Sequence, residues 1–220
     1  MESIKDLFKT GLKGIIYDCD GVMINSRAAN NLFYNSVLAY FNLPPMTHEQ
    51  ELYSFMASGL EALLYILPKE LHKEIDYVVT HVVNYDRDIV PKLTLMPGFR
   101  EFVTEMANLG LKQAMCTNRT AHGFDAVLRF FDFPAYFDPI MTVSVVKPKP
   151  DPEGACKIVE TWQFSPKEIM YIGDSTHDLA AARGAGTHFC AINALDFTGD
   201  ITVNSYEELR KILAPILPIN

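Results

Sequence analysis

The chain has 220 residues, of which 49% are hydrophobic and 21% charged, a composition typical of a globular protein with one core or a core and a small insert. A formal net charge of −8, with lysine and arginine scattered rather than clustered, excludes a surface built to bind nucleic acid. The start lacks the pattern of a signal peptide, and no window reaches the roughly 18 apolar residues of a membrane span, so we expect a soluble cytoplasmic protein without membrane partners.

Short apolar or β-branched runs predict strands at residues 14–19, 111–116, 140–145, 168–172, 187–191 and 201–203. No comparable run lies between residues 26 and 95, and that stretch instead predicts helices at residues 27–41, 47–67 and 68–89. Further helices are predicted between and after the later strands, at residues 97–109, 121–131, 152–162 and 176–183 and from the capping box Ser205-x-x-Glu208 onward.

The alternation of strands and helices predicts an α/β fold, a doubly wound (Rossmann-like) parallel sheet with helices on both faces. The helical stretch after the first strand predicts a small α-helical cap domain inserted into that fold. We therefore assign residues 1–24 and 92–220 to an α/β core domain and residues 25–91 to a helical cap domain.

Ligands of such sheets bind beyond the carboxyl ends of the strands, where loops and helix N-termini meet. The residues that follow the first four strands of the predicted core are acidic, polar or small: Asp18, Asp20 and Gly21; Thr117 and Asn118; Lys147; and Gly173, Asp174 and Asp178. Several carboxylates without a histidine or cysteine cluster favour a hard cation with oxygen ligands, and Mg²⁺ fits best. A lysine with hydroxyl and amide donors facing such a metal makes a site for a phosphoryl group.

Four short segments occur in the order of a known set of motifs: Asp18-Cys19-Asp20-Gly21-Val22, Thr117-Asn118, Lys147-Pro148-Lys149-Pro150-Asp151-Pro152 and Gly173-Asp174-Ser175-x-x-Asp178. This pattern resembles the haloacid dehalogenase-like (HAD) hydrolases, in the phosphoglycolate phosphatase and β-phosphoglucomutase-like subgroup with a helical cap. The resemblance covers the core from about residue 12 to residue 195.

The resemblance implies a role for each motif residue. Asp18 would attack phosphorus and form an aspartyl-phosphate, and Asp20 would act as general acid and then general base. Mg²⁺ would be held by Asp18, the main-chain carbonyl of Asp20, Asp174 and, directly or through water, Asp178. The phosphoryl oxygens would be bound by Thr117, Lys147 and main-chain N–H groups near Gly21 and Asn118.

Other residues of these segments have simpler interpretations. We expect Lys149 to be an exposed loop charge and His177 to be only a neighbour of the motif acids. Ser175 either caps the following helix or orients Asp174. The aromatic side chains of the helical insert, Phe33, Tyr34 and Phe55 among them, are expected to pack helices against one another.

The resemblance therefore implies a Mg²⁺-dependent phosphoric monoester hydrolase acting on a small phosphorylated metabolite. Two alternatives remain open: a sugar phosphomutase of the β-phosphoglucomutase type, and a regulatory protein on the same scaffold that does not turn over. The insert carries no motif that names the substrate, and the sequence does not reveal the oligomeric state.

Overall fold

The computed structural model describes residues 3–194 and 196–217. Its centre is a six-stranded parallel sheet with the strand order β5-β4-β1-β6-β7-β8. The strands are β1 (Gly14–Tyr17), β4 (Lys112–Thr117), β5 (Ile140–Thr142), β6 (Ile169–Gly173), β7 (His188–Ile192) and β8 (Ile201–Val203). All six correspond to predicted strands, so the predicted doubly wound parallel sheet is confirmed.

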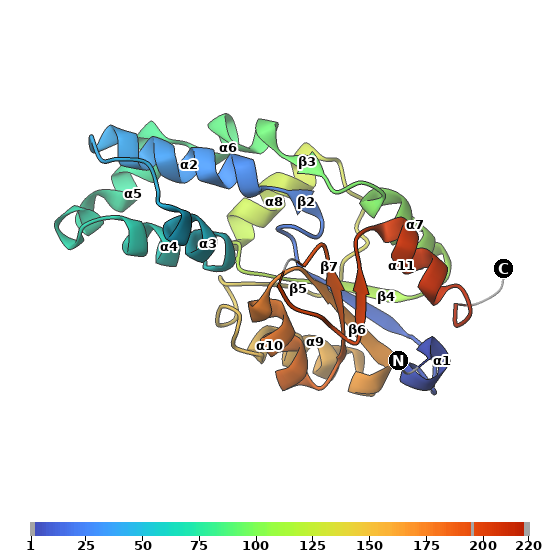
Figure 1. The fold of residues 1–220 in the computed structure, drawn as a ribbon. Helices are drawn as coiled ribbons and strands as arrows, with labels where there is room; N and C mark the ends of the chain where they lie inside the picture. Colours follow the sequence, from blue (N-terminus) through green and yellow to red (C-terminus); the bar gives the residue numbers. More distant parts are fainter. Residues whose placement is uncertain (1–2, 195, 218–220) are drawn as a thin grey trace.

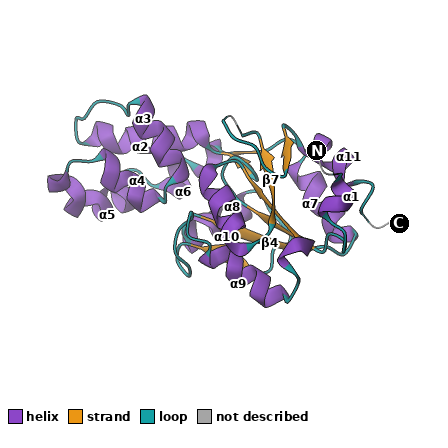
Figure 2. Ribbon diagram, turned by 60° about the horizontal axis from the view of Figure 1, so that its bottom comes forward, coloured by secondary structure: helices purple, strands orange, loops and turns teal. Residues whose placement is uncertain are grey.

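Helices cover both faces of this sheet, as Figure 2 shows. They are α1 (Ile4–Leu7), α7 (Phe99–Asn108), α8 (Ala121–Phe130), α9 (Glu153–Trp162), α10 (Thr176–Ala185) and α11 (Tyr206–Leu213), with a 3₁₀ turn at Pro166–Glu168. Side chains alternate along a strand, so β1 supplies both hydrophobic layers. Tyr17 packs in one layer with Phe102 of α7 and Tyr206 of α11, and Ile16 packs in the other with Trp162 of α9.

The segment between residues 27 and 92, which we call the cap, lies beside one end of the sheet (Figure 1). Its elements are α2 (Arg27–Tyr40), α3 (His48–Met56), α4 (Gly59–Ile66), a 3₁₀ helix (Lys69–Glu74), α5 (Ile75–Tyr77), a π-helix (Val78–Val82), α6 (Tyr85–Asp88) and a 3₁₀ turn (Val90–Lys92). The exact domain boundaries stay a prediction. Among the described residues, no helix combines the length and apolar character needed to cross a membrane.

Two predicted helices of the cap are wrong because local capping interrupts them. The helix predicted at residues 47–67 is two helices, since Ser58 accepts the N–H of Glu61 while the Glu61 carboxylate accepts the N–H of Ser58. The helix predicted at residues 68–89 is a series of short 3₁₀, α and π turns, and Asn84 caps the last α-helical turn by accepting the N–H of Arg87.

Two very short strands join the cap to the sheet. β2 (Ile24–Asn25) and β3 (Thr94–Leu95) form an antiparallel pair. One lies where the chain leaves the sheet for the cap, and the other where it returns. The sequence does not predict them, because two residues are too few to show an alternating pattern. This pair fixes the loop that contains Asp20 at the base of the cap.

Candidate active site

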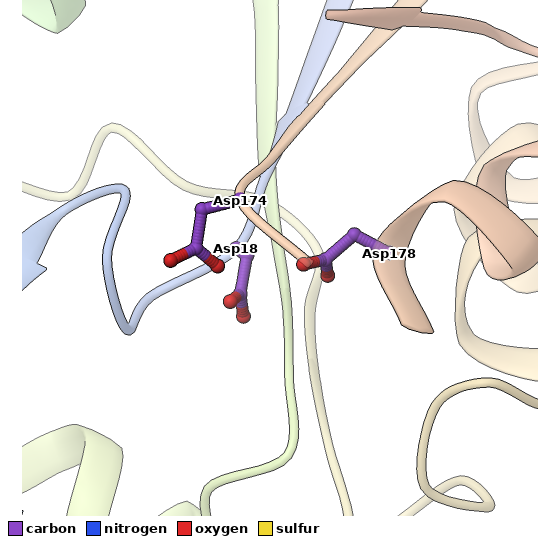
Figure 3. Close-up of side chains that lie close together, drawn as sticks. All are labelled: Asp18, Asp174 and Asp178. Atoms are coloured by element: carbon purple, nitrogen blue, oxygen red, sulfur yellow. The ribbon is translucent and has the colours of Figure 1, made fainter. Parts of the chain in front are cut away.

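Three aspartates from separate segments meet at the carboxyl ends of β1 and β6. Asp18 directly follows β1 and continues its pairing, with its N–H donating to the carbonyl of Ile172 at 3.0 Å. Asp174 follows β6, and Asp178 lies in the first turn of α10. One carboxylate oxygen from each lies within 4.8 Å of the other two, and Figure 3 shows the three side chains gathered together. Their predicted convergence is therefore present.

Gly21 allows the first of these loops to approach the last. Its φ of +74° is a conformation that favours glycine, and a Cβ there would lie 1.8 Å from Oδ2 of Asp174. The N–H of Gly21 donates to the carbonyl of Ile24 at 2.8 Å. That N–H is donated within the loop, and the glycine makes room for Asp174; the expectation that Gly21 also helps to bind a phosphoryl oxygen stays a prediction.

The lysine in this cluster is Lys149, and the expectation that it is an exposed loop charge is wrong. Only 6% of its side chain is exposed, and its Nζ lies 2.6 Å from Oδ1 of Asp18 and 2.6 Å from Oδ1 of Asp178. Asn118 holds the Lys149 backbone, with Oδ1 accepting the N–H at 2.7 Å and Nδ2 donating to the carbonyl at 3.1 Å. Lys149 is therefore fixed at both main chain and side chain.

Lys147, predicted to bind the phosphoryl group, lies outside the cluster. Its side chain is 71% exposed and its Nζ is 3.5 Å from Asp151, while its N–H donates to Glu153. The chain turns at residues 143–145 after β5, and this turn leaves Lys147 facing solvent while Lys149 points inward. The predictions that Lys147 binds the phosphoryl group and that Lys149 is exposed are therefore both wrong, because of this turn.

Burial dominates the electrostatics of the cluster. Burial, together with the negative charges of Asp178 and Asp20, raises the pKa of Asp18 to about 7 although Lys149 opposes the change. Burial also raises the pKa of Asp174 well above its usual range, helped by Asp178 and Asp18. Burial would lower the pKa of Lys149, but the neighbouring carboxylates outweigh it and raise that pKa. The cluster has more negative charge than one lysine neutralises.

Asp20 has its own set of partners, which were not predicted from the sequence. Arg119 donates to it twice, from Nε at 2.8 Å and from an Nη at 2.7 Å, and both side chains are largely buried. Ser26 and Asn30 also donate to the carboxylate of Asp20. Although burial acts in the opposite direction, Arg119 and these donors lower the pKa of Asp20. Asp20 is therefore held as a carboxylate.

Arg119 links this carboxylate to the cap. Its guanidinium donates to the hydroxyl of Tyr85 at 2.9 Å, and that hydroxyl donates to Oδ1 of Asn30 at 2.7 Å. Tyr85 and Asn30 belong to α6 and α2 of the cap. The one signal in the sequence was the position of Arg119 directly after Thr117-Asn118, which places it at the same edge of the sheet.

The remaining predicted residues lie around this centre. Thr117 is buried, and its Oγ1 accepts the N–H of Arg119 at 3.1 Å. Asp178 is fully buried, and Ser175 caps α10 by accepting the N–H of Asp178 at 3.3 Å while its hydroxyl donates to the Asp178 carboxylate at 2.5 Å. His177 Nδ1 lies 3.3 Å from the carbonyl of Met56, in the cap.

A cavity of about 620 Å³ opens between the sheet and the cap, and Asp18, Asp20, Asn118, Lys149 and Asp174 line its inner end. The amide of Asn118 also donates to the Met56 carbonyl at 3.1 Å, at the end of α3. The carboxylate cluster thus faces a partly open space bounded by the cap, an arrangement suited to chemistry on a bound small molecule.

Comparison with known proteins gives consistent matches. A family model described as "Haloacid dehalogenase-like hydrolase" matches residues 15–192. A phosphoglycolate phosphatase of Haemophilus influenzae is 26% identical over 201 residues, which cover 86% of this chain and 87% of that protein. A haloacid dehalogenase-like hydrolase domain-containing protein of Arabidopsis thaliana is 26% identical over 96% of this chain and 88% of its own length.

Solved structures of similar proteins also match the chain. A HAD-superfamily hydrolase of subfamily IA from Geobacter sulfurreducens has a TM-score of 0.73 and 31% identity, covering 92% of this chain and 97% of that one. CbbY from Rhodobacter sphaeroides, solved with xylulose-(1,5)bisphosphate, has a TM-score of 0.74 and 20% identity over 90% of this chain and 96% of its own, which shows a shared fold.

Proposed function

Because the chain belongs to the haloacid dehalogenase-like hydrolases, as its four motifs predict, we propose that it is a Mg²⁺-dependent phosphatase that hydrolyses a small phosphorylated metabolite. The observation that carries this proposal is the contact between Asp18 and Lys149 at the inner end of the cavity, with Asp174 and Asp178 beside them. A carboxylate next to a fixed ammonium group is suited to attack phosphorus while the cation binds the phosphoryl oxygens.

The residues present fit a magnesium ion. Three carboxylates lie within reach of one another, and the raised pKa values of Asp18 and Asp174 mean that their ionised forms need a further cation. Asp18 and Asp174 would hold the ion, with Asp178 in support and the main-chain carbonyl of Asp20 nearby. When bound, Mg²⁺ supplies positive charge that offsets the charge of the transferring phosphoryl group.

The chain's own residues account for the two halves of the reaction. In the first half, an Oδ of Asp18 forms a bond to phosphorus as the bond from phosphorus to the leaving oxygen breaks, and Asp20 donates a proton to that oxygen. In the second half, water attacks phosphorus and gives its proton to Asp20, which regenerates Asp18 and releases phosphate. Lys149 neutralises charge on the phosphoryl oxygens throughout.

The Arg119 contact bears on the acid-base role of Asp20. Held by two hydrogen bonds from Arg119, the Asp20 carboxylate stays ionised and is a weaker base than a carboxylate without such a partner. It is a poor proton donor in that state, so the first half requires that Asp20 turn away from Arg119 towards the leaving oxygen. Thr117 and Asn118 lie next to Arg119 and help to place the phosphoryl group.

The proposal is tested by phosphate release over a panel of sugar phosphates, phosphoglycolate, nucleotides and pyrophosphate, with Asp18→Asn as control. Expected are Mg²⁺-dependent turnover, its loss in EDTA, and a trapped aspartyl-phosphate in the wild type alone. Full activity in EDTA, or wild-type turnover by Asp18→Asn, would contradict the assigned roles. Isomer formation that requires a sugar bisphosphate would instead favour the phosphomutase.

A further inference from the structure

The cavity is much larger than the smallest substrates of related enzymes require. Its volume of about 620 Å³ falls in the range of sites that hold drug-sized ligands. Phosphoglycolate, with its two-carbon alcohol, would occupy the inner end beside Asp18 and leave most of the space towards the cap unfilled. The outer part of the cavity therefore has room for a bulky alcohol.

The side chains that bound this outer part are mainly apolar. Phe33 and Tyr34 come from α2, Leu63 from α4, Ile75 from α5 and Val79 from the π-helix. The first four are buried, so they form a fixed surface that we call the cap wall. An alkyl or aryl group placed against the cap wall would leave water, which is favourable in proportion to the area buried.

The charges that line the cavity do not suit a second anion. Among the described residues, its lining contains one arginine and one lysine, Arg119 and Lys149, and each already contacts carboxylates. The carboxylates added by the cap are Asp76 and Asp86, and both histidines of the lining already have partners: His122 lies 3.0 Å from Asp86, and His72 Nε2 lies 3.0 Å from the Leu67 carbonyl. A carboxylate or second phosphate would lose water here without gaining a counter-ion.

Building on the proposed phosphatase function, we propose that the substrate is a phosphomonoester of a bulky, uncharged alcohol whose apolar part packs against the cap wall. The phosphoryl group lies at Asp18 and Lys149, and the alcohol extends towards α2, α4 and α5. Phosphoglycolate and sugar bisphosphates, which carry a second anion, are correspondingly poor substrates.

The test is kcat/KM for straight-chain alkyl phosphates from ethyl to octyl, each paired with an analogue of equal length that ends in a carboxylate. We expect kcat/KM to rise about 4-fold per methylene until the cavity is filled. Each carboxylate analogue should be about 10- to 100-fold worse than its partner. A flat dependence on length, or a preference for the carboxylates, overturns the inference and leaves the phosphatase in place. If none of these esters is hydrolysed while a compound of the phosphate panel is, the inference alone is overturned; if neither set is hydrolysed, the phosphatase function is overturned as well.

Two matched variants of α4 locate the alcohol. Leu60 lines the cavity and is 61% exposed, whereas Leu64 is 40% exposed on the same helix and does not line it. Leu60→Arg should shift the ratio of kcat/KM values about 3- to 5-fold in favour of the carboxylate analogues. Leu64→Arg should leave that ratio unchanged, and neither change should lower Tm. An unchanged ratio in Leu60→Arg, or an equal shift in both variants, would show that the alcohol does not lie along the cap wall.

Discussion

Replacing Lys149 by methionine removes the ammonium group that bridges Asp18 and Asp178 and keeps a similar unbranched stem. At 2.6 Å and an effective dielectric constant of about 20, each contact has a gross attraction of about 6 kcal/mol, much of it offset by the cost of burying the charges. Breaking a buried pair of this kind costs about 3 to 5 kcal/mol of unfolding free energy. For a chain of this length, that corresponds to a Tm lower by about 6 to 20 °C.

The effect of Lys149→Met on activity should be as large. Loss of one fixed donor to the charge that develops in the transition state reduces kcat by about 10²- to 10³-fold. The assays are phosphate release with saturating Mg²⁺ and thermal unfolding with and without Mg²⁺. Since the ion also compensates the carboxylates, the Tm deficit should be largest in EDTA.

Lys147→Met is the matched control. Its side chain is exposed and its ion pair with Asp151 is long, so the change should alter the unfolding free energy by no more than about 0.5 kcal/mol and leave turnover near the wild-type value. A hundredfold loss in Lys147→Met together with an active, stable Lys149→Met would refute the assignment of Lys149 to the site.

Three further predictions concern the carboxylates. Asp18→Asn should abolish turnover and leave the fold intact, measured by phosphate release and circular dichroism; appreciable turnover would exclude Asp18 as nucleophile. Arg119→Ala should raise the pKa of Asp20, and because kcat/KM covers the half-reaction in which Asp20 donates a proton, the alkaline limb of the kcat/KM profile should move to higher pH; an unmoved limb would separate Arg119 from the acid-base step. In metal-free protein, the pKa of Asp18 is raised to about 7, so the folded state binds extra protons between about pH 4 and 7 and its stability falls as pH rises through that window. Mg²⁺ should then raise Tm more at about pH 8 than at about pH 5, and an equal rise at both would argue against an ion bound at Asp18.

The sheet could be predicted because its central strands are buried apolar runs. Gly14–Tyr17 and Ile169–Gly173 are buried throughout, as expected of central strands in a parallel sheet covered on both faces. The acids directly after those strands, Asp18 and Asp174, were located for the same reason. Short helices and strands show too few residues for a clear hydrophobic pattern. Ser58-x-x-Glu61 is nevertheless a recognisable capping box, which would have divided the helix predicted at residues 47–67.

The choice between Lys147 and Lys149 could not be made from the sequence. Both precede a proline in the same short segment, and the direction in which each points depends on how many residues the turn after β5 consumes. Arg119 was missed for a different reason. Its partner Asp20 lies 99 residues away along the chain, and a single arginine in a loop has no pattern that distinguishes a buried ion pair from a solvated charge.

The contact at Met56 uses a main-chain oxygen of the cap rather than a side chain. Asn118 and His177 both meet the main-chain carbonyl of Met56, one of the carbonyls that the end of α3 leaves without a helical partner. Any amino acid at this position offers the same oxygen. This contact between the cap and the catalytic half is thus insulated from replacement of the side chain at position 56, whereas the contacts of Arg119 with Tyr85 and of Tyr85 with Asn30 depend on side chains. New preferences could evolve elsewhere in the cap while the contact at this carbonyl is kept.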